Sequence, residues 1–236
     1  STLEGILALE PRIETFLSGH ADPVGRAEVE ALKASMAALV LTHSDGDHIN
    51  GLPGFPKGLA IVAHEKCRDD IAAAAGAQPE LAEYLPTRTY TDRLELVPGP
   101  NAVILAHFGP AHTSGDTVVF FPADRAVFVG DLLFVDCHPY LGDGDPDTLR
   151  CALDGVLALD PVAVVPGHGP VGTAESLRAM RGYVETLDQL AREMVADGES
   201  EEAIAAMAVP PPYDGWQIRM FFASNLRTLY RRASAR

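Results

Sequence analysis

The chain has 236 residues, with 33 acidic and 18 basic side chains, and a formal net charge of −15. Apolar residues make up 47% and charged residues 22%, which excludes global disorder and collagen-like structure. Nucleic acids and anionic membrane surfaces are bound by clustered Lys and Arg, so the acidity argues against both partners. No apolar run approaches the roughly 18 residues of a membrane-spanning helix. We therefore expect a small-molecule partner, with no nucleic acid and no membrane.

The cysteines are few and odd in number. Cys67, Cys137 and Cys151 form no CxxC pair, and this usage is typical of reduced thiols in a cytoplasmic protein. Because the chain starts at Ser1 rather than Met, a removed signal peptide stays compatible with the sequence. Homo-oligomer formation also stays open.

Short apolar strands alternate with longer helical patterns along the chain. In order, the patterns predict a helix over 26–36, a strand over 37–42, a helix over 65–75, strands over 103–106, 117–121 and 126–129, a helix over 148–159, a strand over 162–165, and helices over 174–196 and 218–232. Strands interleaved with helices indicate an α/β layered fold. Since no Pro- or Ser-rich linker interrupts the chain, we expect one domain over 1–236.

The N-terminal segment resembles a later one. Residues 3–28 align with 153–175 with small gaps and about half of the positions identical, including a Gly-His and a Pro-Val-Gly. We interpret 1–36 as containing a partial duplicate of 153–180, or the remnant of a preceding similar domain. Either origin makes His20 a positional copy of His168.

Polar clusters follow four of the five predicted strands. Ligands of α/β sheets sit beyond the carboxyl ends of strands, so these side chains are expected to converge. A lone histidine at a strand end usually caps or packs, but four glycine-flanked clusters favour a metal centre. Four imidazoles and three carboxylates are too many for one metal and suit two, with a carboxylate between them. The candidates are His43, Asp45, Asp47, His48, His112, Asp131 and His168.

These residues resemble the signature of the metallo-β-lactamase superfamily, H-x-H-x-D-H followed by a His, a Gly-Asp and a Gly-His. The resemblance runs from about residue 37 to 180 and implies an αββα sandwich with metals at the edge of two sheets. It assigns His43, Asp45 and His112 to one metal and Asp47, His48 and His168 to the other, bridged by Asp131. The sequence departs from the signature at Asp45, where the family usually has His. The N-terminal part of the usual fold is short or remodelled.

The resemblance implies a hydrolase that uses a metal-activated hydroxide on a small ester, thioester, lactone or amide. Two divalent ions are expected, with zinc as the default. Asp45 makes the core formally neutral, which suits iron or manganese better than an all-imidazole site does and attracts anionic β-lactams less. An enzyme with a single ion is compatible with the same residues. So are a non-haem iron oxidoreductase of dioxygenase or di-iron type, and a binding protein without turnover.

Further residues are assigned roles around this core. Asp47 and Asp131 are the catalytic candidates, with Asp47 as a proton acceptor. The turn-rich segment 136–147 follows Asp131, and its His138 and Tyr140 are candidates for substrate contact. Thr113 and Asp116 either orient the His112 ring or cap a turn.

Overall fold

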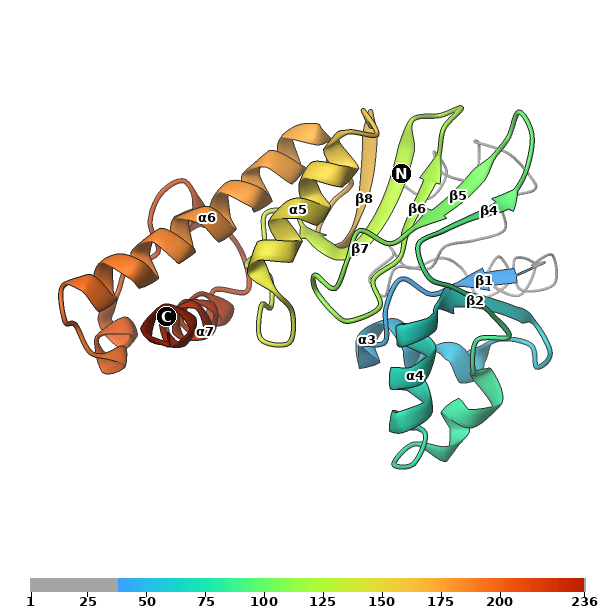
Figure 1. The fold of residues 1–236 in the computed structure, drawn as a ribbon, viewed down its shortest axis with the longest axis horizontal. Coiled ribbons are helices and arrows are strands. Elements are labelled where there is room, and N and C mark those ends of the chain that lie inside the picture. Colours follow the sequence, from blue (N-terminus) through green and yellow to red (C-terminus); the bar gives the residue numbers. More distant parts are fainter. Residues whose placement is uncertain (1–37, 236) are drawn as a thin grey trace.

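A computed structural model describes residues 38–235 of the chain (Figure 1). The smaller of its two sheets has three parallel strands in the order β1-β2-β3, and the larger has five in the order β4-β5-β6-β7-β8. Within the larger sheet, neighbours pair antiparallel except β7 and β8, which are parallel. The strands are β1 (Ala38–Val40), β2 (Ala60–His64), β3 (Arg88–Tyr90), β4 (Arg93–Val97), β5 (Val103–Ala106), β6 (Val118–Phe121), β7 (Ala126–Phe134) and β8 (Ala163–His168).

Helices cover the outer face of each sheet (Figure 1). The short α3 and the longer α4 belong to the smaller sheet, whereas α5 and α6 lie against the larger one and α7 packs on α6. The α-helices are α3 (Gly46–Ile49), α4 (Glu65–Ala74), α5 (Pro146–Leu157), α6 (Ala174–Ala196) and α7 (Met220–Ser234). Short 3₁₀ helices occupy Leu52–Gly54, Pro79–Tyr84, Glu201–Ala206 and Tyr213–Gly215.

Three separate apolar cores hold these layers together. The middle core joins the sheets, with Val62 and Tyr90 from the smaller sheet against Leu105 and Phe128 from the larger one. A second core lies between the smaller sheet and α4, and a third lies between the larger sheet and helices α5 to α7. The resulting order of helix, sheet, sheet and helix confirms the predicted αββα sandwich.

The predicted helices agree closely with the structure where it describes them. Helix α6 spans the predicted 174–196, and Gly198 follows it with φ of +70°, the left-handed conformation that ends a helix. Helix α5 begins two residues before the prediction because Pro146 occupies its first turn and the Asp145 carboxylate accepts hydrogen bonds from two backbone N–H groups there. The predicted helix over 26–36 lies outside the described residues, as does the whole of the proposed duplicate within 1–36, with His20.

The strand prediction was incomplete. It omitted β2, β3 and β4, and it ended β7 five residues early, at Val129. In β4, exposed and half-buried side chains alternate, so that strand lacks the continuous apolar run on which the prediction relied. Strand β7 continues to Phe134 past two irregularities in its pairing with β8, on either side of Gly130. Asp131 therefore lies within a strand rather than beyond its end.

Among residues 38–235, no helix combines the length and the apolar content that crossing a membrane requires.

The C-terminal helix is fastened to the segment after β7 by one buried amide. Asn225 of α7 accepts a hydrogen bond from the Leu141 backbone N–H at 3.0 Å. Its side-chain nitrogen donates to the Pro139 carbonyl at 2.7 Å. Asn225 is 1% exposed, so water cannot replace either bond. This contact sets the path of residues 139–141, which run beside the candidate site described below.

We predict that Asn225→Leu, which keeps the side-chain volume, lowers the free energy of unfolding by about 2–3 kcal/mol. The substitution leaves the buried Leu141 N–H and the buried Pro139 carbonyl without hydrogen-bond partners. Urea unfolding followed by circular dichroism measures the loss. Thr228→Ala in the same helix is the control, since the Thr228 hydroxyl donates to the Ser224 carbonyl one turn earlier. The control should change stability by about 0.5 kcal/mol or less. Equal losses in the two variants would contradict the assigned role.

Candidate metal centre

The structure brings all seven metal-ligand candidates together at one edge of the sandwich. They come from four segments far apart in the sequence. His43 follows β1, Asp45 precedes the first residue of α3, and Asp47 and His48 lie in the first turn and the last turn of that short helix. His112 lies in the loop between β5 and β6, and Asp131 and His168 lie in β7 and at the end of β8.

The Asp131 carboxylate lies at the centre of the group. Its oxygens are 3.1 Å from the Nε2 atom of His48 and 3.2 Å from that of His168. The Nε2 atoms of His112 and His43 follow at 3.5 and 3.8 Å. Asp131 is 5% exposed, so the four imidazoles rather than water surround its charge. One carboxylate thus contacts every histidine of the predicted centre.

Two outer groups of three residues flank this carboxylate, and they match the two predicted ligand sets. In the first group, Asp45 Oδ2 lies 3.1 Å from His112 Nε2 and 3.9 Å from His43 Nε2. In the second group, Asp47 Oδ2 lies 3.3 Å from His168 Nε2 and 3.6 Å from His48 Nε2. Two ligand atoms on a tetrahedral zinc ion with bonds of about 2.1 Å are about 3.4 Å apart. The observed separations surround that value.

Several buried polar atoms of the centre are not hydrogen-bonded within the protein. These atoms are His43 Nε2, His48 Nε2 and Asp131 Oδ1. The last two are 3.1 Å apart, yet their orientation does not make a hydrogen bond. Buried polar atoms without partners are costly and therefore rare. A cation placed between the lone pairs would satisfy all three atoms, so the donor set fits the implied metal ions.

Burial and neighbouring charges set the protonation states. Burial lowers the pKa of His43 to about 3, so its imidazole is neutral with a lone pair to offer. Burial would raise the pKa of Asp131, but the adjacent imidazoles of His168 and His48 outweigh it and hold that pKa well below its usual range. The hydrogen bond with His112 lowers the pKa of Asp45. Asp45 and Asp131 are therefore ionised, as carboxylate ligands of a metal must be.

Two glycines let Asp131 reach its position. At Gly130, φ is +53°, and a Cβ atom there would lie 2.8 Å from Thr42 Cβ. Such a bulge redirects the side chain that follows it. At Gly167, a Cβ atom would lie only 1.7 Å from Asp131 Oδ1. Any side chain at position 167 would displace the central carboxylate. This steric limit explains why a glycine precedes His168.

Asp116 holds the backbone of the His112 loop. One of its oxygens accepts from the backbone N–H groups of His112 at 2.8 Å and Ala111 at 3.1 Å. The other accepts from the Thr113 backbone N–H at 3.0 Å and hydroxyl at 2.7 Å. Of the two roles considered for Thr113 and Asp116, the structure supports the turn. They fix the backbone from which His112 projects and not its ring.

Phe134 is a neighbour of the centre that the sequence analysis missed. Its ring stacks on His168, with centroids 4.6 Å apart and planes inclined by 17°, and it lies 6.3 Å from the His112 ring. It is 3% exposed and ends β7, where it pairs in register with His168. An apolar residue at the end of a strand carries no sequence signal for such a role.

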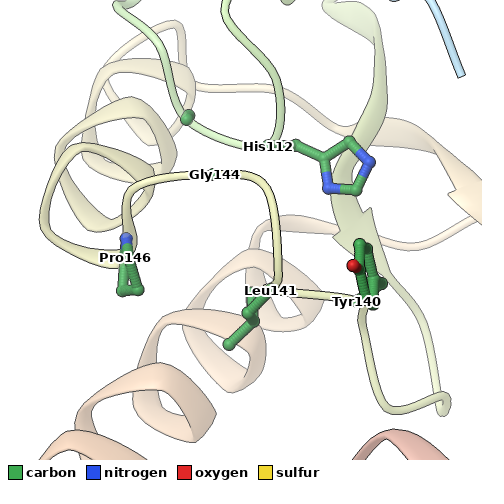
Figure 2. A pocket seen from close by; sticks show the side chains of 6 residues that line it. His112, Tyr140, Leu141, Gly144 and Pro146 are labelled. Carbon is green, nitrogen blue, oxygen red and sulfur yellow. The ribbon is translucent and has the colours of Figure 1, made fainter. Parts of the chain in front are cut away.

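Of the two candidates for substrate contact, only Tyr140 lies beside the centre. Tyr140 and Leu141 line a recess together with His112, and Ala111, Gly144 and Pro146 complete it (Figure 2). The Asp143 carboxylate raises the pKa of Tyr140, so its hydroxyl stays protonated at neutral pH. Its ring packs against Phe221 of α7, with centroids 5.6 Å apart.

His138 lies in a different environment from the one that a substrate contact needs. It is fully buried, its Nδ1 lies 3.0 Å from the Tyr183 hydroxyl, and Trp216 and Phe222 surround its ring. A substrate could not reach this side chain without unpacking the aromatic cluster. His138 is buried because its segment turns inward after β7 to pair with Gln217.

Comparison with known proteins gives the same picture. A family model described as the metallo-beta-lactamase superfamily matches residues 27–168. Hydroxyacylglutathione hydrolase from a Synechococcus species is 31% identical over 160 residues, which are 63% of this chain and 56% of that protein. A metallo-beta-lactamase type 2 from Bacteroides fragilis is 27% identical over 161 residues, 66% of this chain and 62% of that protein.

A third relative is the alpha subunit of 2,4-dinitroanisole O-demethylase from a Nocardioides species, 29% identical over 168 residues that cover 66% of this chain and 48% of that protein. The chain thus spans between about half and three fifths of the length of these relatives.

Solved structures share the fold at lower identity. The crystal structure of VMB-1 aligns with a TM-score of 0.57 and 19% identity, covering 68% of this chain and 74% of that one. A metallo-beta-lactamase from Pontibacter korlensis aligns with a TM-score of 0.54 and 22% identity, covering 64% and 69%. The family match spans more than half of the sequence and ends on the last ligand candidate, His168, so this chain belongs to the metallo-β-lactamase superfamily.

Proposed function

We propose that the protein is a metal-dependent hydrolase of a small ester, thioester, lactone or amide. The observation that carries the proposal is the buried Asp131 carboxylate among four imidazoles, with three buried polar atoms that a cation would satisfy. The names of two relatives, a hydroxyacylglutathione hydrolase and a metallo-beta-lactamase, support hydrolysis. The comparisons lend the iron oxidoreductase no support, and the non-catalytic binding protein is left as an outcome of the first test below.

Each residue then has a defined task. His43, Asp45 and His112 would hold one divalent ion, Asp47, His48 and His168 would hold the other, and Asp131 would bridge them. When bound, such ions acidify a water molecule and polarise the carbonyl of the substrate. Zinc is the expected metal, and iron or manganese are the ions that the added carboxylate of Asp45 would favour instead.

Proton transfer falls to the most accessible carboxylate of the centre. The Asp47 side chain is 52% exposed, whereas that of Asp131 is 5% exposed. Asp47 can therefore meet both solvent and the leaving group, and it takes up the proton during turnover. Asp131 keeps the two halves of the centre in register. The Tyr140 hydroxyl, beside His112, donates a hydrogen bond to the substrate.

We predict that protein purified without chelator contains two zinc ions per chain and hydrolyses neutral thioesters or lactones. Elemental emission and a thiol-release assay measure these properties. Removal of metal with a chelator should abolish hydrolysis, and added zinc should restore it. One iron per chain with oxygen uptake would instead favour the oxidoreductase. Negligible transition metal would favour a binding protein without turnover.

We predict that Asp45→His leaves the fold intact and raises zinc affinity at the first group by about tenfold, or 1.4 kcal/mol, because imidazole binds zinc more strongly than a carboxylate that is already hydrogen-bonded to His112. Competition with a chromophoric chelator measures the affinity. Asp45→Asn, which removes the charge without supplying an imidazole, should weaken binding. Equal or weaker binding by Asp45→His would count against Asp45 as a ligand.

We predict that Tyr140→Phe lowers kcat/KM about tenfold, the loss expected for one hydrogen bond to the substrate, with metal content unchanged. The matched control is Tyr230→Phe, which removes a hydroxyl that donates to the Glu199 carbonyl on the surface. Steady-state kinetics of both variants provide the comparison. Unchanged kinetics in Tyr140→Phe would remove Tyr140 from the substrate site.

A further inference from the structure

One exposed carboxylate joins the two loops that carry the first ligand group. Asp70 belongs to α4, outside the metal centre. Its Oδ2 atom accepts a hydrogen bond from the Ser44 hydroxyl at 3.3 Å and another from the Ser114 hydroxyl at 3.0 Å. The two serines are 70 positions apart in the sequence, and a single oxygen atom ties them together.

Both serines lie within two residues of ligand candidates of the first group. Ser44 lies between His43 and Asp45, and Ser114 lies two residues after His112. The second group has other supports, because Asp47 and His48 lie in α3 and His168 ends β8. The bonds to Asp70 therefore act on all segments that supply the first group, and His168 of the second group lies on a separate element.

The helix that carries Asp70 is seated directly against one of these loops. A Cβ atom at Gly115 would lie 2.3 Å from the backbone nitrogen of Cys67, so loop and helix meet backbone to backbone. Cys67 is fully buried at this contact. At the inner side, the Thr117 backbone N–H donates to the Thr42 carbonyl at 2.7 Å. The two loops are thus joined on the inside by their backbones and on the outside through Asp70.

We propose that Asp70 is a positioning residue for the first metal site, holding Asp45 and His112 at the separation that one cation requires. The proposal rests on the proposed function only in that the first group binds metal. Ligands that are already in place lose less freedom on binding, so their supports contribute to metal affinity without touching the metal. Removal of Asp70 should weaken the binding of one of the two ions and leave the binding of the other unchanged.

The test is a zinc titration against a chromophoric chelator, with Asp70→Ala compared with Asp69→Ala. Asp69 is the neighbour on the same helix, is also exposed, and its nearest cation is Lys66 at 3.8 Å. Both variants remove one negative charge, but only the first removes the bonds to the loops. We expect Asp70→Ala to lose about tenfold in affinity for one ion, the same ion that Asp45→Ala loses, and Asp69→Ala to match the parent protein. An equal loss of affinity for both ions, or the same loss of affinity in the two variants, would overturn the proposal.

Asp70→Asn separates the hydrogen bonds from the charge. Its amide oxygen can still accept from both serines, so it should recover most of the affinity that Asp70→Ala loses. If the Asn variant binds zinc as weakly as the Ala variant, the charge of Asp70 alone accounts for the effect, and the positioning role is wrong.

A second readout needs no metal. Amide hydrogen exchange of the metal-free protein should quicken in residues 43–46 and 112–116 of Asp70→Ala and remain unchanged in Asp69→Ala. If the protein binds no zinc, the proposed function fails, but the exchange experiment still decides whether Asp70 holds the loops. Unchanged exchange in Asp70→Ala would overturn the proposal even if the protein proves to be a zinc hydrolase.

Discussion

The structure depends on one buried negative charge. Asp131 is almost inaccessible to water, and an isolated carboxylate in such a place is strongly unfavourable. Four imidazoles from three segments offset this cost, and their arrival at one point dictates how the loops around β1, β5 and β8 must run. Gly130 and Gly167 follow from the same constraint, since one lets the strand bulge and the other leaves room for the carboxylate. The loops and glycines around Asp131 thus bring four imidazoles into contact with its charge.

The two halves of the centre differ in exposure and in support. Asp45 is 34% exposed at its side chain, whereas His43 and His112 beside it are almost completely buried. A carboxylate where the superfamily usually has an imidazole thus stands on the solvent side of the first group. The residues that organise this half, Asp116 and Asp70, act on loop backbone and on serine hydroxyls instead of on ligand rings. Its geometry is consequently a property of two loops and one helix.

The sequence predicted the centre better than the sheet around it. Most of the candidate ligands lie in short glycine-flanked motifs, which can be recognised in a sequence without knowledge of the fold. These residues are His43, Asp47, His48, His112 and His168. Strand β4 was missed because its alternating side chains lack an apolar run, and strand β3 is only three residues long.

Residues that act through packing were harder to find. Phe134 was missed because an aromatic residue at a strand end looks like ordinary core. His138 was misplaced for a related reason. Its turn-rich neighbourhood predicted an exposed loop, but aromatic rings more than forty positions away bury it. Contacts of this kind between distant residues leave no local pattern.

The bonds of Asn225 to residues 139 and 141 have a consequence for how this scaffold can diversify. The wall of the recess beside His112 takes its shape from an amide that lies 84 positions downstream of Leu141, on the last helix. Substitutions in that helix can therefore reshape the recess while every candidate metal ligand stays in place. Libraries aimed at new substrate selectivity would do well to randomise the C-terminal helix, far from the chemistry, before altering the motif residues.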